Sequence, residues 1–415
     1  MNLDEVWSYG FTHAIYLGEI PYRDFNMVIP PLYPFLMSIP MHIFGNNILV
    51  FHIENAIIIT LFLYFCFQML KEKTYYILPF LIFPLNVTFP NYNFVLLLLF
   101  TILLQFEQKE KNDYVIGFFY AIIFLIKQTV GLPLILISLY YYQTPKKLKK
   151  RMVGFVLPIL IFGIYLLFTS SFFSFLDICF FGLLDFGAKN GKIRSIYFYM
   201  TILLIVIVFL FIRKEKKNMD YGYFFFFLIN SIPLFDLYHF QLLWIFFLII
   251  FLKNHDIHYQ PKLIGLSLWI GFLFISTMYS EIGKAPYPNS ISHFEYRFLP
   301  KRNIQYTKMG LELMNKYPKA VFIDPNAHYF KIILNQKITK LDLINMGNNG
   351  YHGSDKLIQK IKELDGEYVF FVNPRELGTK KQTDQKLIRY IMKQGRLIEK
   401  TPIYDVYTLE GEKND

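Results

Sequence analysis

Long apolar runs are the feature that most limits what this chain can become. Residues 196–212 and 263–279 contain no charged side chain, and residues 48–70 contain one acidic side chain, Glu54, and no Lys or Arg. Each run can cross a hydrocarbon core of roughly 30 Å as a helix. A soluble protein must cover itself with polar surface, whereas 54% of these residues are hydrophobic. The sequence therefore predicts an integral membrane protein.

Apolar length and helix-breaking residues predict about ten membrane-spanning helices after residue 47. The expected segments are 48–70, 74–90, 92–107, 114–127, 130–143, 152–170, 196–212, 220–236, 238–252 and 263–281. We accordingly expect an N-terminal outer loop with juxtamembrane helices (1–47), a transmembrane domain (48–281) and a separate C-terminal domain (282–415).

The distribution of cationic residues predicts which side of the membrane each loop occupies. One set of loops holds about fifteen Lys and Arg and the opposite set about five, so the first set is expected in the cytoplasm. Its basic clusters lie at 71–73, 109–111, 146–151, 213–217 and 253–262. The N-terminal 47 residues and the C-terminal domain would then lie outside. We also expect that a first transmembrane helix, absent from this chain, belongs upstream of Met1.

Beyond residue 281 the apolar fraction falls and charges are interspersed, as in a soluble domain. Short apolar stretches predict buried strands, and amphipathic spacing predicts helices. The expected strands are 320–323, 368–372 and a closing pair at 396–400 and 403–409, and the expected helices are 305–316, 354–364 and 382–394. The sequence therefore predicts a compact α/β domain on the outer face.

Several classes of function are disfavoured by composition. The formal charge of +11 is scattered in short clusters between apolar runs and indicates cytoplasmic loops rather than a nucleic-acid partner. The two cysteines, Cys66 and Cys179, lie inside apolar stretches, so neither a disulfide nor a cysteine metal site is expected. No Gly-rich nucleotide loop is found in the sequence.

Polar residues are most concentrated near the N-terminus, where Asp4 and Glu5 precede an aromatic residue and a glycine. Two adjacent carboxylates at a membrane face can remove a proton from an acceptor hydroxyl or hold a divalent cation. They can equally be solvated, or cap the helix that follows.

The order of this segment resembles the first outer loop of GT-C glycosyltransferases. Asp-Glu is followed by Pro-Tyr-Arg-Asp-Phe at 21–25 and Pro-Pro-Leu-Tyr at 30–33. The pattern is most similar to the bacterial branch related to protein O-mannosyltransferases and the lipid A aminoarabinose transferase (glycosyltransferase family 39). The resemblance extends over roughly residues 4–281, but only the loops carry specific motifs. It implies a multi-span α-helical membrane fold of the GT-C type. It also implies a polyprenyl-phosphate sugar as donor.

The same resemblance assigns roles to the acidic residues of the loop. The catalytic base would be Asp4, with Glu5 beside it and Asp24 as a second acidic group. One departure concerns Val28 and Ile29, which stand where the aminoarabinose branch has an acidic residue and a lysine. Phosphate contact by that route is lost, and a divalent metal becomes doubtful as a cofactor.

Cationic residues elsewhere can replace that contact. Lys127 and Gln128 interrupt an apolar run, where a cation is costly unless it faces a cavity or a partner. We expect them to bind the donor phosphate, although Lys127 could instead snorkel to the interface. Arg23 is a further candidate, with an ion pair to a neighbouring aspartate as the alternative. His239 could hydrogen-bond the phosphate or serve only a structural role.

Polar residues at two further turns are expected to line the substrate pocket: Asn91, Tyr92 and Asn93 at one, and Asp236 and Tyr238 at the other. An ordinary Pro/Asn turn is the alternative for the first. Glu54, inside a spanning segment, is either functional or a polar contact to a neighbouring helix.

These features predict transfer of one sugar from an undecaprenyl-type phosphate to a hydroxyl of a glycan, lipid or protein, in assembly or modification of the cell envelope. A polysaccharide polymerase or ligase would instead gather its key residues in one large central loop. A transporter of lipid-linked glycans would need charges at mid-membrane and an inverted repeat. A non-catalytic scaffold for wall assembly is the remaining alternative.

Overall fold

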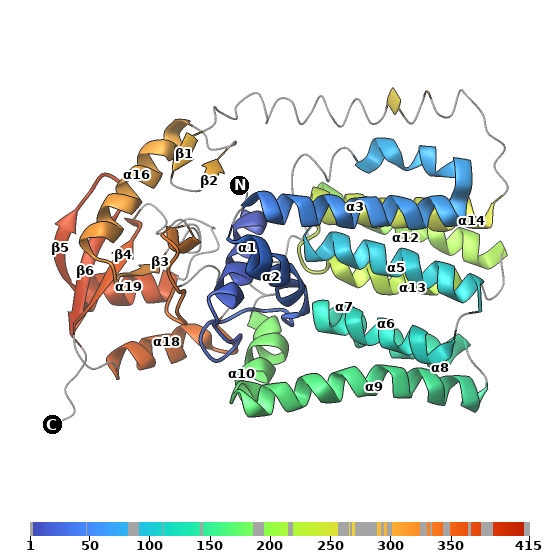
Figure 1. Ribbon diagram of the computed structural model, residues 1–415, viewed down its shortest axis with the longest axis horizontal. Coiled ribbons are helices and arrows are strands. Elements are labelled where there is room, and N and C mark those ends of the chain that lie inside the picture. Colours follow the sequence, from blue (N-terminus) through green and yellow to red (C-terminus); the bar gives the residue numbers. More distant parts are fainter. Residues whose placement is uncertain are drawn as a thin grey trace.

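The computed structural model is drawn in Figure 1. It describes residues 3–46, 48–81, 91–110, 112–141, 144–185, 195–214, 219–255, 265, 268–269, 289–291, 294–296, 301–323, 330–332, 334–342, 349–363, 367–374 and 385–410.

Residues 3–255 form a bundle of helices, most of which run side by side in Figure 1. The bundle contains α1 (Leu3–Tyr16), α2 (Leu32–Phe44), α3 (Ile48–Leu70), η1 (Lys71–Tyr76), α5 (Tyr92–Gln108), α6 (Asp113–Ile126), α7 (Gln128–Gly131), α8 (Leu134–Tyr141), α9 (Pro145–Phe168), α10 (Phe172–Leu176), η2 (Asp177–Phe181), α12 (Ile196–Lys214), α13 (Met219–Leu228), η3 (Ile229–Ser231) and α14 (Leu237–Asn254). The short helices α1 and α2 lie at the end of the bundle that faces the C-terminal domain.

In the part of the chain that the structure describes, three helical stretches are long and apolar enough to cross a membrane: Leu49–Tyr76, Pro145–Phe168 and Leu237–Asn254. Helix α9 also exposes large apolar side chains along its length, such as Leu160 and Leu167. Contiguous exposed apolar surface of this kind requires a lipid environment. The chain is therefore a membrane protein.

Several observed helices fall where apolar length predicted them, whereas the expected segments 130–143 and 220–236 are not single long helices: α8 covers only Leu134–Tyr141, and α13 ends at Leu228 before the short helix η3. Helices α3, α5 and α6 differ by at most one residue at either end from the expected segments 48–70, 92–107 and 114–127. Most of the expected segment 263–281 and residues 82–90 lie outside the described residues. The number of spans therefore stays a prediction.

Helices α6 and α9 approach closely because each contributes a glycine to the contact. A Cβ atom on Gly117 would collide with the backbone carbonyl of Arg151, and one on Gly154 would collide with that of Tyr114. Small residues allow such close backbone packing where lipid offers no hydrophobic drive for helix association.

A buried ionic network joins four helices of the bundle. The Arg151 guanidinium on α9 donates to both carboxylate oxygens of Glu107 on α5, at 2.5 and 2.9 Å, and to Asp113 on α6 at 2.8 Å. Tyr223 on α13 donates to the same Glu107 at 2.7 Å. The Arg151 side chain is only 3% exposed, so its charge depends on these two carboxylates for compensation.

The C-terminal domain is built on a four-stranded sheet in the order β3-β4-β6-β5. Strands β3 and β4 are parallel, and the other pairs are antiparallel. The elements are β1 (Asn289–Ile291), β2 (Phe294–Tyr296), α16 (Lys301–Lys316), β3 (Val321–Ile323), α18 (Gly353–Lys362), β4 (Glu367–Val372), α19 (Gln385–Gln394), β5 (Arg396–Lys400) and β6 (Asp405–Glu410). The α/β architecture of this region is as the sequence predicted.

The C-terminal domain docks on the end of the bundle through polar contacts. The Asn335 Oδ1 atom accepts from His13 Nε2 on α1 at 3.0 Å, and the backbone N–H of Ile338 donates to the Glu19 carboxylate at 3.2 Å. Lys356 on α18 pairs with Asp177 of η2 at 2.7 Å. The loop between α1 and α2 is thus held between the helices and the α/β domain.

We expect Arg151→Met to lower the free energy of unfolding by roughly 3–5 kcal/mol, because Glu107 and Asp113 would remain buried without their cation. Thermal unfolding of the detergent-solubilised protein measures the loss. The matched control is Lys149→Met, which removes an exposed cation from the same helix. A second substitution, Glu107→Gln, should restore part of the loss, and equal midpoints for Arg151→Met and Lys149→Met would contradict this role.

Candidate functional site

A cavity with about 420 Å³ of empty space lies where α1, the following loop, α2 and α5 meet. Its walls are almost wholly apolar or aromatic: Trp7, Ser8, Phe11, Val28, Ile29, Tyr33, Pro34 and Tyr92. A lining of this kind suits an apolar group carrying few polar atoms.

The expected catalytic pair, Asp4 and Glu5, belongs to the first turns of α1. The backbone there is helical, whereas both side chains lie outside the described residues. Trp7, less than one turn further along α1, lines the cavity, so the acidic pair is carried by a helix that forms the cavity wall. Asp4 and Glu5 stay predicted catalytic residues.

Lys127 stands at a break between α6 and α7, where its backbone leaves the helical region (φ −151°, ψ 102°). Its ammonium donates to the Asn230 side-chain oxygen at 2.7 Å, to the Asn230 carbonyl at 3.2 Å and, at a longer 3.4 Å, to Asn93 Oδ1. These partners are neutral oxygens, and among the described residues no carboxylate forms an ion pair with Lys127. The ammonium is therefore held in place by neutral oxygens, and the Asp236 carboxylate acts on it electrostatically without forming an ion pair.

The Tyr92 ring connects this cation to the cavity. The Lys127 ammonium lies 5.7 Å from the centre of the ring, within reach of a cation–π interaction. The same tyrosine lines the apolar cavity. A ligand with an apolar part in the cavity and an anionic group beside Tyr92 would have its charge near Lys127.

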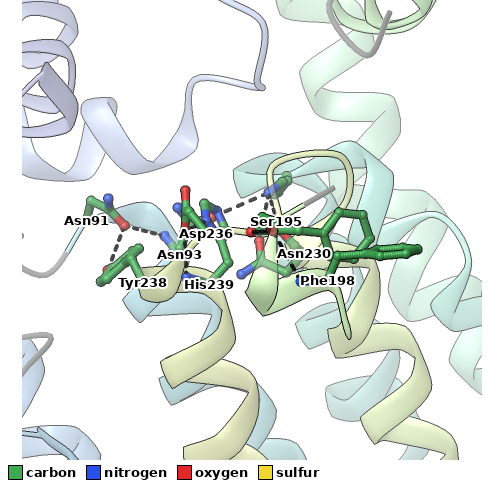
Figure 2. A network of polar contacts seen from close by, with 10 residues as sticks. Asn91, Asn93, Ser195, Phe198, Asn230, Asp236, Tyr238 and His239 are labelled. Carbon is green, nitrogen blue, oxygen red and sulfur yellow. Dashed lines mark hydrogen bonds and ion pairs between the residues drawn. The ribbon is translucent and has the colours of Figure 1, made fainter. Parts of the chain in front are cut away.

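The start of α14 supplies a histidine held by an aspartate, as Figure 2 shows. Asp236 caps the helix by accepting from the His239 backbone N–H at 2.9 Å, and the same oxygen lies 2.8 Å from His239 Nδ1. The carboxylate fixes the ring and places the proton on Nδ1. The other ring nitrogen, Nε2, is buried and has no hydrogen-bond partner in the described part of the chain.

Asn91 caps α5 next to this histidine. Its side-chain oxygen accepts from the Asn93 backbone N–H at 2.9 Å and from the Tyr238 hydroxyl at 3.1 Å (Figure 2). The two turns that the sequence singled out, 91–93 and 236–239, therefore meet in one polar cluster. Tyr92, Asn93, Tyr238 and Asp236 all take part in it.

Several buried polar atoms of this cluster have no hydrogen-bond partner among the described residues. They are the side-chain nitrogens of Asn91 and Asn230 and the Nε2 atom of His239. Buried polar groups are normally hydrogen-bonded, and each exception calls for an explanation. A polar ligand beside Lys127 would supply hydrogen-bond partners for atoms of this kind.

Gln128 is nearly fully buried and holds the cavity wall in place. Its side-chain nitrogen donates to the Cys179 carbonyl at 2.6 Å and to the Val28 carbonyl at 3.0 Å. Both amide hydrogens are thereby used, and this favours a positioning role over the direct phosphate contact expected from the sequence.

Arg23 and Asp24 lie together on the loop between α1 and α2. The guanidinium forms two hydrogen bonds with the carboxylate, each 2.8 Å, and the Asp24 carboxylate also accepts from the Ile20 backbone N–H. The Arg23 hydrogen bonds are the largest cause that lowers the pKa of Asp24. The Arg23 side chain remains 47% exposed, so the ion-pair interpretation holds, and a contact to the donor phosphate stays a prediction.

Glu54 is buried in α3, and one of its carboxylate oxygens has no hydrogen-bond partner. Its nearest electrostatic neighbours include Tyr9 and Tyr33, and Tyr33 lines the cavity. Glu54 therefore lies behind the cavity wall.

No group of three or more His, Cys, Asp or Glu side chains is arranged to hold a metal ion in the part of the chain that the structure describes. His239 has one carboxylate neighbour, Asp236, and too few further ligands for a divalent cation. The described residues do not fit a metal site.

Two residues of the site were not predicted from the sequence. Asn230, the main partner of Lys127, interrupts a strongly apolar run together with Ser231, and that interruption was the available signal. Trp7 was noted only as the aromatic residue that follows Asp4 and Glu5, whereas in the structure its side chain lines the cavity.

Comparison with known proteins identifies the fold. No protein-family model and no curated protein sequence matches the chain. Its structure is similar to the crystal structure of ArnT from Cupriavidus metallidurans bound to undecaprenyl phosphate, with a TM-score of 0.57 and 10% sequence identity. The alignment covers 97% of this chain and 93% of the ArnT chain, so the likeness includes both the bundle and the C-terminal domain. The chain therefore shares its overall fold with ArnT.

Proposed function

We propose that this protein is a membrane glycosyltransferase that moves a sugar from a polyprenyl-phosphate donor to a hydroxyl acceptor. The observation that carries the proposal is the partly buried Lys127 ammonium, which lies 5.7 Å from the ring of Tyr92, a residue that lines the apolar cavity. A polyprenyl phosphate has this combination of properties, because an anionic phosphate joins an apolar chain. The fold shared with ArnT, whose structure holds undecaprenyl phosphate, supports the same donor class.

In this proposal Lys127 stabilises the phosphate as it leaves. The acceptor oxygen forms a bond with the anomeric carbon, and the bond from that carbon to the phosphate oxygen breaks with its electron pair. Negative charge therefore grows on the lipid phosphate in the transition state. An ammonium already fixed by Asn230 and Asn93 stabilises that charge without reorganisation.

His239 acts on the same phosphate. With Nδ1 bound to Asp236, the Nε2 atom is placed to donate a hydrogen bond to a phosphate oxygen. The Asp236 carboxylate keeps the ring in the required orientation.

Asp4 takes the proton of the acceptor hydroxyl during the attack, and the configuration at the anomeric carbon inverts. Two observations support this assignment: the resemblance of the loop motif and the position of α1 along the cavity wall. Glu5 and Asp24 are the alternative candidates for the catalytic base. The loop motif also favours a place near glycosyltransferase family 39.

We further propose that the reaction occurs on the outer face, in assembly or modification of the cell envelope. Of the basic clusters, the described parts at the end of α3, after α5 and at the start of α9 lie at the ends of these helices away from α1 and α2 (Figure 1), which supports their placement on the cytoplasmic side. The cavity and the C-terminal domain would then face outward. Cysteines at the exposed positions Lys319, in the C-terminal domain, and Lys149, on α9, test this arrangement, because an impermeant reagent added outside should label only the first.

Replacing Lys127 by Gln should lower kcat/KM for the lipid donor by roughly 10²–10³-fold, since the growing charge on the phosphate loses its fixed cation. Transfer of radiolabelled sugar from polyprenyl phosphate by membranes measures the effect. The matched control is Lys73→Gln, which removes another ammonium bound by backbone carbonyls, at the opposite end of the bundle. Equal turnover by Lys127→Gln and the wild type would exclude a role for Lys127.

The His239 ring nitrogen can be tested with two substitutions that differ in one hydrogen-bond donor. We expect His239→Phe to reduce transfer roughly 10- to 100-fold, the value of a hydrogen bond to a charged group. His239→Gln should retain most activity, because its side-chain nitrogen can stand near the Nε2 position. If both variants lose the same activity while folding normally, the donor role is wrong.

Asp4→Asn should reduce transfer by at least about 10²-fold, the contribution of a general base, with donor binding unchanged. Binding of undecaprenyl phosphate and turnover are measured separately on the same preparation. Full turnover by Asp4→Asn would move the base to Glu5 or Asp24, and the corresponding amide variants distinguish those two.

A further inference from the structure

Helices α5 and α14 begin next to each other in the polar cluster beside Lys127 (Figure 2). The Tyr238 hydroxyl, in the first turn of α14, donates to the side-chain oxygen of Asn91, the N-cap of α5, at 3.1 Å. The Lys127 ammonium reaches Asn93, in the first turn of α5, at 3.4 Å. The N-terminus of a helix favours an anion, so two helix N-termini and one cation act on the same place.

Two asparagines in this cluster carry a buried amide nitrogen that has no hydrogen-bond partner within the described residues. They are Asn91 and Asn230, each only 2% exposed. An N–H group that is buried without a partner is unfavourable, and in a native fold such a group calls for a ligand or an ordered water. Two such groups in one cluster therefore indicate a site for a ligand that accepts hydrogen bonds.

The contacts of the two amides determine which atom of each is the nitrogen. The Asn91 side-chain oxygen accepts from the backbone N–H of Asn93 at 2.9 Å, and the Asn230 side-chain oxygen accepts from the Lys127 ammonium at 2.7 Å. Neither of these donors can accept a hydrogen bond, so neither amide can be turned round without losing its contact. The unpaired atom of each side chain is therefore an N–H donor.

These groups select a ligand whose oxygens carry negative charge and accept hydrogen bonds. Asp236, the carboxylate of the cluster, already accepts from the His239 backbone N–H and lies against its ring. A phosphate that joins a sugar to a lipid has one negative charge and two non-bridging oxygens, which match one ammonium and two amides. A neutral sugar hydroxyl would not use the Lys127 charge.

We propose that the side-chain amides of Asn91 and Asn230 bind the two non-bridging oxygens of the donor phosphate and hold it against Lys127. The inference rests on the proposed transferase function and adds two residues that recognise the lipid donor. The apolar cavity lined by Tyr92, the residue after Asn91, takes the adjoining part of the lipid chain. Both oxygens are charged before and after the sugar leaves, so the amides act mainly on the affinity for the donor.

The test measures binding of farnesyl phosphate, and of farnesol, which lacks the phosphate, to the full chain in neutral detergent by calorimetry. Asn91→Ser keeps an oxygen that can cap α5 and removes the amide N–H. It should weaken binding of farnesyl phosphate roughly 10- to 100-fold, the value of a hydrogen bond to a charged group. Asn230→Asp keeps the oxygen that holds Lys127 and puts a negative charge in place of the free N–H, so it should weaken binding at least as much. Neither variant should change binding of farnesol.

Asn112 provides the matched control. It caps α6 at the end opposite Lys127, where its side-chain oxygen accepts from the Tyr114 backbone N–H at 3.1 Å. Asn112→Ser and Asn112→Asp make the same chemical changes at an exposed helix cap, and both should bind farnesyl phosphate as the wild type does. Inorganic phosphate, tested as a competitor, should bind far more weakly than farnesyl phosphate because it leaves the apolar cavity empty.

Four results would contradict the inference. Unchanged binding of farnesyl phosphate in Asn91→Ser and Asn230→Asp would remove the amides from the site, and weaker binding by Lys127→Gln in the same assay would leave the proposed function standing. Wild-type binding of farnesyl phosphate no tighter than that of farnesol would overturn the proposed function as well. Equal affinity for inorganic phosphate would assign the amides to a free phosphate. A parallel loss of farnesol binding in both variants would show that the amides only maintain the cavity.

Discussion

The burial of one ammonium group inside an apolar bundle is the constraint on which the site depends. Lys127 cannot stay charged there unless oxygens surround it, and the break between α6 and α7 brings it to the Asn230 carbonyl and side chain. The same break allows Gln128 to hold the loop at Val28 and η2 at Cys179. Neutral partners stabilise the cation and leave its charge available to an anion. An aspartate in direct contact would have removed that possibility.

The site also depends on Tyr92, which lines the cavity and lies beside the Lys127 ammonium. Tyr92 follows the Asn91 cap of α5, so the first turn of one helix places its ring between Lys127 and the cavity. Helix α1 forms another wall, and the C-terminal domain fixes the end of α1 through His13 and the following loop through Glu19. The α/β domain therefore helps to hold the helix that carries the expected catalytic acids.

Much of the fold could be predicted because its signals are local. Apolar length located α3, α5 and α6 to within one residue at either end, and alternating or amphipathic patterns located β3, β4 and α19. The site was predictable only as separate pieces. Polar residues in apolar surroundings drew attention to Lys127 and His239, whereas Asn230 gave a weak signal inside an aromatic run. Gln128 was expected at the phosphate and instead binds two backbone carbonyls, a contact that no spacing in the sequence encodes.

The sequence by itself determined that this is a membrane protein with an α/β domain at its C-terminus, because hydrophobicity and periodicity act over neighbouring residues. It also limited the chemistry to a few polar residues at the ends of apolar segments. Only the tertiary structure brings the turns at 91–93 and 236–239 together. It also places Asp236 against Nδ1 of His239 and leaves the Nε2 atom of that ring without a hydrogen-bond partner among the described residues. It also decided that an apolar cavity lies against the Lys127 cation. These contacts join residues far apart in the chain, and only the packing of the helices brings them together.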